Sequence, residues 1–301
     1  MLRKEIKTPF NADSVEVSPD LSSIFVGMYE YDEASSTRGG GFMILDSEGN
    51  LKLEEKTEYG CLDAKWVSND IISIACSDGF LRWFSYADDN VFHETPCVLA
   101  PNSNDTSNII MTIDTVQENT ACITAKGQLL FLKNTDVVQS WQAHSPVFES
   151  WCCALNPSGN IVVSGSDDCS LNYWDTRSCE LILSDKRNHR MGTTAVEFLS
   201  DVTLLSGSYD EYIREFDIRN QSTPVREIKS IGGIWRIKPF EDKLYVAACY
   251  GGCQVLRLTN LEIILPFYSG HQSMAYGIGA LGNSQAASCS FYDKSVQIWS
   301  F

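Results

Sequence analysis

Short apolar stretches alternate with polar turns along the whole chain, and the pattern is clearest at residues 163–177, VSGSDDCSLNYWDTR. Small and apolar residues lead into the acidic pair Asp167–Asp168, and Leu171, Tyr173 and Trp174 then resume a strand composition. Turn residues between two such runs predict a β-hairpin. The dipeptide Trp174–Asp175 at its end is typical of a propeller blade.

This hairpin is repeated along the chain. In three copies an aromatic residue follows the turn aspartate by six positions: Asp168 with Trp174, Asp210 with Phe216, and Asp293 with Trp299. Weaker copies occupy residues 24–46, 72–84, 121–132 and 246–258, the first of them with a long loop at 30–41 between its strands. A further short strand is expected before each copy, at residues 14–17, 62–66, 109–113, 150–155, 194–198, 234–237 and 276–280.

Seven units spaced by roughly 40 to 50 residues predict an all-β fold, a seven-bladed WD40-type β-propeller. No long segment has helical periodicity, so an α/β alternative fails. The last unit ends at Trp299 with its third strand, whereas residues 2–8 have no place in the first unit. We therefore expect the N-terminal strand to complete the last blade, so that residues 1–301 form a single domain without an exposed sheet edge there.

Charge and cysteine content limit the partners and the compartment. The net charge of −16 disfavours direct binding of nucleic acid. An acidic surface suits a basic partner, or it only keeps the protein soluble. The 11 cysteines are odd in number, no secretory signal follows Met1, and no apolar run is long enough to span a membrane. These features predict a cytoplasmic protein with free thiols that binds no membrane, metal or cofactor.

The histidines have both a structural and a catalytic interpretation. In repeats of this type, a histidine before the blade commonly hydrogen-bonds the turn aspartate, which would assign His144 to Asp168 and His271 to Asp293. In the last blade Cys289 is expected where a hydroxyl would complete the network. The sequence around His189 fits this pattern less well, so both interpretations stay open for it. No nucleophile elbow, zinc-protease motif or phosphate loop is present in the sequence. The pattern alone predicts a binding scaffold.

Several phrases are not general features of WD-repeat propellers. The more specific ones are WQAHSPVFESW (141–151), NHRMG (188–192) and GGIWR (232–236), and ADSVE (12–16), GSYDE (207–211) and SCSFYD (288–293) accompany them. Together they resemble the diphthine methyl ester hydrolase family, the WD-repeat proteins of diphthamide synthesis that are also called diphthine methyltransferases. The sequence departs from the family at Cys249–Tyr250, where many members have Met-His.

The resemblance implies that the methyl ester of methylated diphthine, a modified histidine on translation elongation factor 2, is hydrolysed to diphthine and methanol. We expect a monomer without a cofactor, and we expect water to be the nucleophile because the sequence contains no nucleophile elbow. A non-catalytic propeller that assembles other proteins is the alternative. The candidate catalytic residues are His144, Glu149, His189 and Arg236, and the candidate contacts to the trimethylammonium group are Trp235, Tyr209, Tyr276 and Tyr292.

Overall fold

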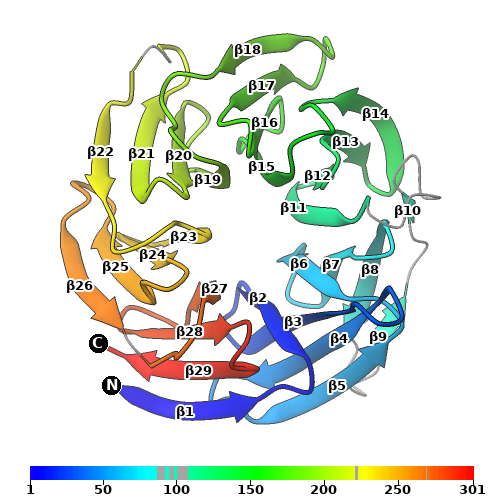
Figure 1. The fold of residues 1–301 in the computed structure, drawn as a ribbon, viewed down its shortest axis with the longest axis vertical. Helices are drawn as coiled ribbons and strands as arrows, with labels where there is room; N and C mark the ends of the chain where they lie inside the picture. The colour runs from blue at the N-terminus through cyan, green and yellow to red at the C-terminus, as the bar shows by residue number, and fades with distance from the viewer. Residues whose placement is uncertain (87–91, 95–97, 100–107, 221–222, 269) are drawn as a thin grey trace.

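Seven four-stranded or five-stranded antiparallel sheets form a closed ring in the computed structural model (Figure 1). The structure describes residues 1–86, 92–94, 98–99, 108–220, 223–268 and 270–301. The regular structure of these residues consists of strands alone. The predicted all-β, seven-bladed propeller is thus confirmed.

The blades follow one another in chain order, and each begins with its innermost strand. The first three comprise β2 (Asn11–Val17), β3 (Ser23–Asp32), β4 (Thr37–Asp46) and β5 (Leu51–Thr57); β6 (Cys61–Trp66), β7 (Ile71–Cys76), β8 (Phe80–Tyr86), β9 (Phe92–Glu94) and β10 (Val98–Leu99); and β11 (Ile110–Val116), β12 (Asn119–Thr124), β13 (Gln128–Lys133) and β14 (Asp136–Gln142). The fourth and fifth comprise β15 (Ser150–Leu155), β16 (Ile161–Ser166), β17 (Leu171–Asp175) and β18 (Leu181–Asp185); and β19 (Thr193–Phe198), β20 (Thr203–Ser208), β21 (Tyr212–Asp217) and β22 (Arg226–Lys229). The last two comprise β23 (Arg236–Phe240), β24 (Lys243–Ala247), β25 (Cys253–Arg257) and β26 (Ile263–Tyr268); and β27 (Ala275–Ala280), β28 (Gln285–Ser290), β29 (Ser295–Ser300) and β1 (Leu2–Lys7).

The N-terminal strand closes the ring, as predicted. β1 pairs antiparallel with β29, with Leu2 opposite Trp299 and Lys7 opposite Ser295. The two chain ends therefore lie side by side at the outer edge of the last blade (Figure 1). The backbone of Thr8 donates to the carbonyl oxygen of Lys294 at 2.9 Å, which extends this pairing by one step.

The hydrophobic core lies between neighbouring blades and not in the centre of the ring. One cluster, for example, joins Phe25 and Phe42 of the first blade to Ile74 and Phe84 of the second. The Phe25 and Phe42 rings stack with centroids 5.6 Å apart. Because each blade buries its faces against two others, no blade has a complete core of its own.

The prediction of a long loop at residues 30–41 is wrong. β3 and β4 continue as a ladder to the pair Asp32–Thr37, so only residues 33–36 form the turn. The error arises from the glycine run at 39–41, which looks like a loop composition. Gly40 and Gly41 have φ values of 155° and 149°, and a Cβ atom at either would collide with the carbonyl oxygens of Met28 and Glu55 respectively. Glycine is needed there because two backbones approach closely within a strand.

Candidate functional site

A cavity of about 670 Å³ opens at one end of the central channel, and we call it the mouth cavity. The innermost strands and the loops that precede them supply most of its lining, and the β3–β4 hairpin supplies one side. Five of the predicted site residues are among the lining residues: Glu149, Trp235, Arg236, Tyr276 and Tyr292.

A repeated irregularity of the innermost strands directs side chains to this cavity. In six of the seven blades the register of the innermost strand shifts near its first residue, and one residue is left without a Cα partner. These residues are Asp13, Leu62, Met111, Trp151, Thr194 and Tyr276. All except Thr194 line the mouth cavity. Such β-bulges re-aim side chains, and they are frequent next to functional sites.

Aromatic rings form one wall of the cavity. Trp235 stacks on Tyr276 with centroids 4.4 Å apart and an interplanar angle of 16°, and Trp151 lies 5.2 Å from Trp235 on the other side. Phe291 continues the row at 5.1 Å from Tyr276, followed by Tyr292 at 5.0 Å from Phe291. This row of five rings, from Trp151 to Tyr292, is the aromatic wall, and its π-faces can bind a cation.

An aspartate and an arginine lie at the inner end of the cavity. Asp13 is 7% exposed, and burial raises the pKa of its carboxyl group to about 7; Asp63 adds to the increase, whereas Arg236 opposes it. The Arg236 guanidinium donates to the carbonyl oxygen of Trp235 at 3.1 Å and lies 3.9 Å from the Asp63 carboxylate. Asp63 is held in turn by the backbone N–H of Ile113 at 3.2 Å. Near neutral pH, Asp13 is therefore balanced between its acid and its base forms beside a fixed positive charge.

Beyond the inner end of the mouth cavity, the central channel is filled by ion pairs. Lys65 contacts Asp114 at 3.0 Å and Glu197 at 3.9 Å, and Lys238 contacts Glu16 at 2.7 Å. The space among these groups is only about 40 Å³. The mouth cavity is thus open to solvent on one face of the ring and narrow at its inner end.

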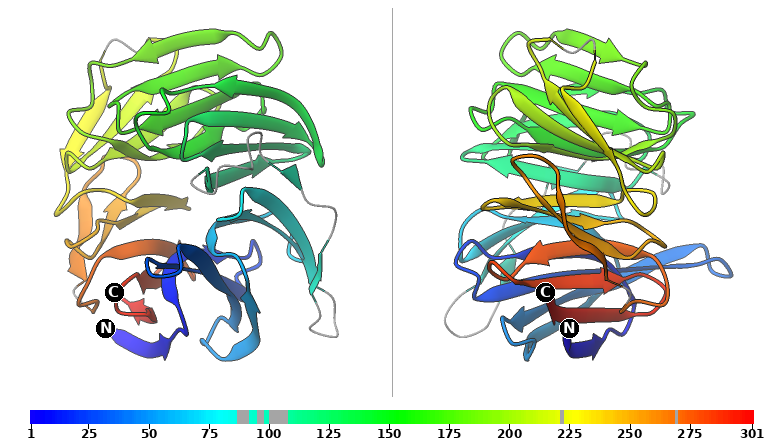
Figure 2. Two further views of the ribbon diagram at one scale, coloured as in Figure 1. Left: turned by 45° about the vertical axis from the view of Figure 1, so that its right-hand side comes forward. Right: turned by 90° about the vertical axis from the view of Figure 1, so that its left-hand side faces the viewer.

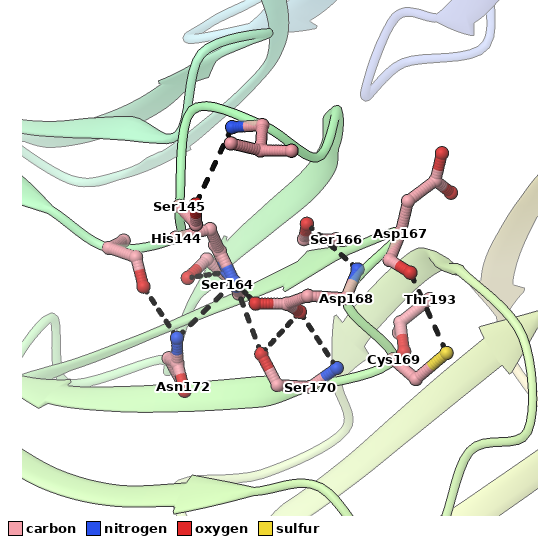
Figure 3. A network of polar contacts seen from close by, with 12 residues as sticks. His144, Ser145, Ser164, Ser166, Asp167, Asp168, Cys169, Ser170, Asn172 and Thr193 are labelled. Carbon is pink, nitrogen blue, oxygen red and sulfur yellow. Dashed lines mark hydrogen bonds and ion pairs between the residues drawn. The ribbon is translucent and has the colours of Figure 1, made fainter.

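His144 belongs to a buried network in the fourth blade and does not line the mouth cavity. Its Nε2 contacts the Ser164 hydroxyl at 2.9 Å, and its Nδ1 contacts the Asp168 carboxylate at 3.3 Å (Figure 3). Ser170 and Asn172 lie 3.2 Å and 3.3 Å from the same Nδ1 (Figure 3). Burial acts against the ionised form of Asp168, but hydrogen bonds from His144 and Ser170 hold its pKa well below the usual range. This network joins the loop before the blade to the hairpin turn, which is the structural interpretation of His144.

His189 also lies outside the lining of the cavity. Its Nε2 contacts the Ser206 hydroxyl at 2.8 Å, and burial lowers the pKa of the ring to about 4. The turn aspartate of this blade, Asp210, bonds the Arg190 backbone at 3.0 Å and pairs with Arg214 at 2.9 Å. His189 is therefore packed in its blade as a neutral group.

The sequence predicted that the histidine network of the last blade lacks a hydroxyl group because Cys289 takes its place. The structure has this hydroxyl group one residue earlier, on Ser288. Ser288 contacts Nε2 of His271 at 2.7 Å and accepts a hydrogen bond from the Trp299 indole at 2.9 Å. The expectation that Cys289 occupies this position is wrong, because Cys289 is on the opposite side of the strand and contacts the Gly277 backbone. Tyr209, the remaining predicted residue, packs against Gly233 and is not part of the cavity lining.

Sequence reasoning missed Asp13, Asp63 and Trp151. Asp13 and Asp63 are acids near the start of innermost strands, in NADSVEV and CLDAKW. Trp151 closes the phrase FESW and donates its indole N–H to the Asp167 carboxylate at 2.7 Å, which fixes its ring. An acid in an innermost strand was the available signal, but Glu16, Asp114 and Glu197 share it and belong to the ion pairs of the channel, so the signal alone does not select the cavity.

The described part of the chain contains no group of three or more His, Cys, Asp or Glu side chains placed to hold a metal ion. None of its residues form a helix that is long and apolar enough to cross a membrane.

Comparison with known proteins supports both the fold and the resemblance. Residues 135–175 match the family described as WD domain, G-beta repeat. A chain in the crystal structure of the mitotic checkpoint complex has a TM-score of 0.79 and 12% identity, and the match covers 100% of this chain and 92% of that chain. At this identity the likeness shows the fold alone.

Two curated relatives match nearly from end to end. A protein of Dictyostelium discoideum named diphthine methyltransferase homolog is 29% identical over 96% of this chain and 96% of its own. A diphthine methyltransferase of Schizosaccharomyces pombe is 26% identical over 97% of this chain and 95% of its own. The protein is thus a seven-bladed WD-repeat propeller related over nearly its whole length to the diphthine methyltransferases.

Proposed function

We propose that this protein acts in diphthamide biosynthesis, in the cytoplasm, as a hydrolase for the methyl ester of methylated diphthine on translation elongation factor 2. One observation carries the proposal: a single cavity combines an aromatic wall with a buried acid beside a guanidinium group. The relatives named diphthine methyltransferase supply the substrate. The reaction gives diphthine and methanol.

The aromatic wall suits the trimethylammonium group of this substrate. A quaternary ammonium ion cannot donate hydrogen bonds, so aromatic faces and nearby carboxylates are the groups that recognise it. Trp235 and Tyr276 present stacked rings, and the carboxylates of Glu149 and Glu33 also line the cavity. We assign the cation to this wall and the ester to the inner end of the cavity.

Asp13 and Arg236 supply the chemistry in this assignment. The Asp13 carboxylate accepts a proton from water as the water oxygen attacks the ester carbon. The Arg236 guanidinium stabilises the negative charge that forms on the carbonyl oxygen. When the C–O bond to the methoxy group breaks, Asp13 returns the proton to the leaving oxygen and methanol departs. A pKa near 7 allows the same group to serve as base and then as acid.

The face around the cavity suits a protein-borne substrate. Eight large hydrophobic side chains are exposed there, Tyr31 near the end of β3 and seven on loops: Val147, Phe148, Met191, Tyr209, Ile231, Tyr250 and Tyr292. Exposed apolar side chains gathered on one face are typical of protein interaction sites. The modified side chain would enter the cavity while the surrounding surface of elongation factor 2 covers this ring.

The test is release of methanol from elongation factor 2 that carries methylated diphthine. We expect the wild-type protein to release one methanol per modified factor. Asp13→Asn should not, whereas Asp20→Asn, in the β2–β3 turn, should behave as wild type. A well-folded wild-type protein that releases no methanol would overturn the hydrolase and favour a non-catalytic scaffold.

A further inference from the structure

Among the described residues, the hairpin of β3 and β4 in the first blade has the longest strands. β3 and β4 each have 10 residues, whereas the second and third strands of the other six blades have 5 to 7. The additional residues extend the ladder as far as Asp32 opposite Thr37, and Tyr31 and Glu33 near the tip line the mouth cavity. In the right-hand view of Figure 2 this hairpin projects beyond the rest of the ring.

A second cavity, of about 620 Å³, lies along the other side of this hairpin, and we call it the hairpin groove. It is lined by Ser36, Thr37, Arg38, Gly39, Glu58, Ser77 and Asp78. Arg38 lines both this groove and the mouth cavity, so the two spaces are adjacent. Its guanidinium donates to the Tyr29 hydroxyl at 3.1 Å and lies over the Tyr31 ring at 4.8 Å, which fixes the boundary between them.

The hairpin groove is polar and carries charges of both signs. Glu58 and Asp78 line it together with Arg38, and Asp32 lies at the adjoining hairpin tip. Asp78 is neutralised by a two-point contact with Arg82 at 2.8 Å, whereas Glu58 is exposed. Serine and threonine hydroxyls complete the lining and can bond an extended backbone.

We propose that the hairpin groove binds a basic, extended segment of the protein substrate next to the modified residue. This proposal rests on the proposed function, since it assumes that a protein-borne side chain occupies the mouth cavity. A chain that leaves the cavity past Arg38 enters the groove directly, and the carboxylates of Glu58 and Asp32 attract lysine and arginine side chains there. The β3–β4 hairpin then lies between the modified residue in the mouth cavity and its flanking segment in the groove, and it contributes to the specificity for the protein substrate.

The test uses a pair of charge reversals, one within β5 and one just after its last residue. Glu58→Lys changes the groove, whereas Glu55→Lys makes the same change of net charge on β5 outside the groove. We expect Glu58→Lys to raise KM for modified elongation factor 2 roughly fivefold with kcat unchanged, and Glu55→Lys to leave both unchanged. The difference should disappear at 1 M salt, because the interaction is exposed and screened.

Direct binding separates this proposal from the hydrolase. The same two variants are compared with wild type for their Kd towards elongation factor 2 by biolayer interferometry. Weaker binding by Glu58→Lys alone supports the groove even if the wild-type protein releases no methanol, which would overturn only the proposed reaction. Equal behaviour of Glu58→Lys and Glu55→Lys in both assays overturns the groove.

Discussion

The His144 network and the Asp13 site are both buried polar arrangements, but their hydrogen bonds differ. Both ring nitrogens of His144 have partners in its own blade, and the neighbouring Asp168 is held ionised. Asp13 is buried in a bulge at the mouth cavity, and its pKa is raised because burial disfavours its charge. A network in which both histidine nitrogens are bonded stabilises the fold, whereas a carboxyl group with a raised pKa in a cavity is available for proton transfer. Histidine is the more common general base in enzymes, but here the aspartate, Asp13, lines the mouth cavity and His144 does not.

Ionisation of the two aspartates affects the stability of the fold in opposite directions. The lowered pKa of Asp168 means that its ionised form stabilises the folded state, whereas the raised pKa of Asp13 means the reverse. The folded-state pKa of Asp13, about 7, lies above its ordinary value of 3.8. The unfolded chain therefore loses this proton first, and the folded state loses stability as pH rises from about 4 to about 7. Retaining such a group at a cost in stability is typical of functional sites.

The largest expected effect is that of Asp13→Asn on turnover. The amide is nearly the same size but cannot accept the proton from water, so kcat for methanol release should fall roughly a hundredfold to ten-thousandfold. At pH 8 the variant should also melt at a higher temperature than wild type, because the cost of ionising Asp13 in the folded state is removed. Loss of activity together with a lower melting temperature would instead show that Asp13 is a structural residue.

The pH dependence of wild-type turnover is the next largest effect. The base form of Asp13 is required, so kcat/KM should rise about tenfold per pH unit below pH 7 and level off above it. The profile is measured by methanol release between pH 5 and pH 9, with circular dichroism to confirm that the protein stays folded. A profile that is flat from pH 5 to pH 9 would exclude Asp13 as the base.

The sequence predicted the blades of the propeller but not the residues that meet in the mouth cavity. The hairpin repeat at 163–177 predicted the blade, and the unpaired last strand predicted its closure by β1, because strand pairing is encoded locally in alternation and turn residues. The mouth cavity joins side chains such as Asp13, Trp151 and Arg236 from distant blades. Asp13 and Trp151 reach the cavity through a bulge in their innermost strand, which a single sequence does not mark, whereas Arg236 is the first residue of β23, whose pairing is regular. The glycines of β4 led to the wrong prediction of a loop for a related reason. They allow two backbones to approach closely within a strand, and this approach is visible only in the folded protein.

The aromatic wall should show a smaller effect, on substrate binding. Trp235→Leu keeps an apolar side chain but removes the central π-face between Trp151 and Tyr276, so KM should rise roughly tenfold with little change in kcat. Trp235→Phe retains a π-face and is the matched control, with a smaller rise expected. Equal KM values for the two variants would show that Trp235 acts only by packing.

The smallest effect on turnover is expected for His144→Ala, which tests the structural side of the comparison. Removal of the ring leaves the buried Ser164 hydroxyl without its partner and removes one contact of Asp168, which keeps Ser170, and the free energy of unfolding should fall by about 1–3 kcal/mol. His271→Ala should cost less, because His271 contacts only Ser288 through Nε2 and its Nδ1 has no partner among the described residues. Denaturant unfolding and methanol release are measured on both variants below their melting temperatures. Full stability with lost turnover in His144→Ala would return that histidine to the reaction and reverse the comparison.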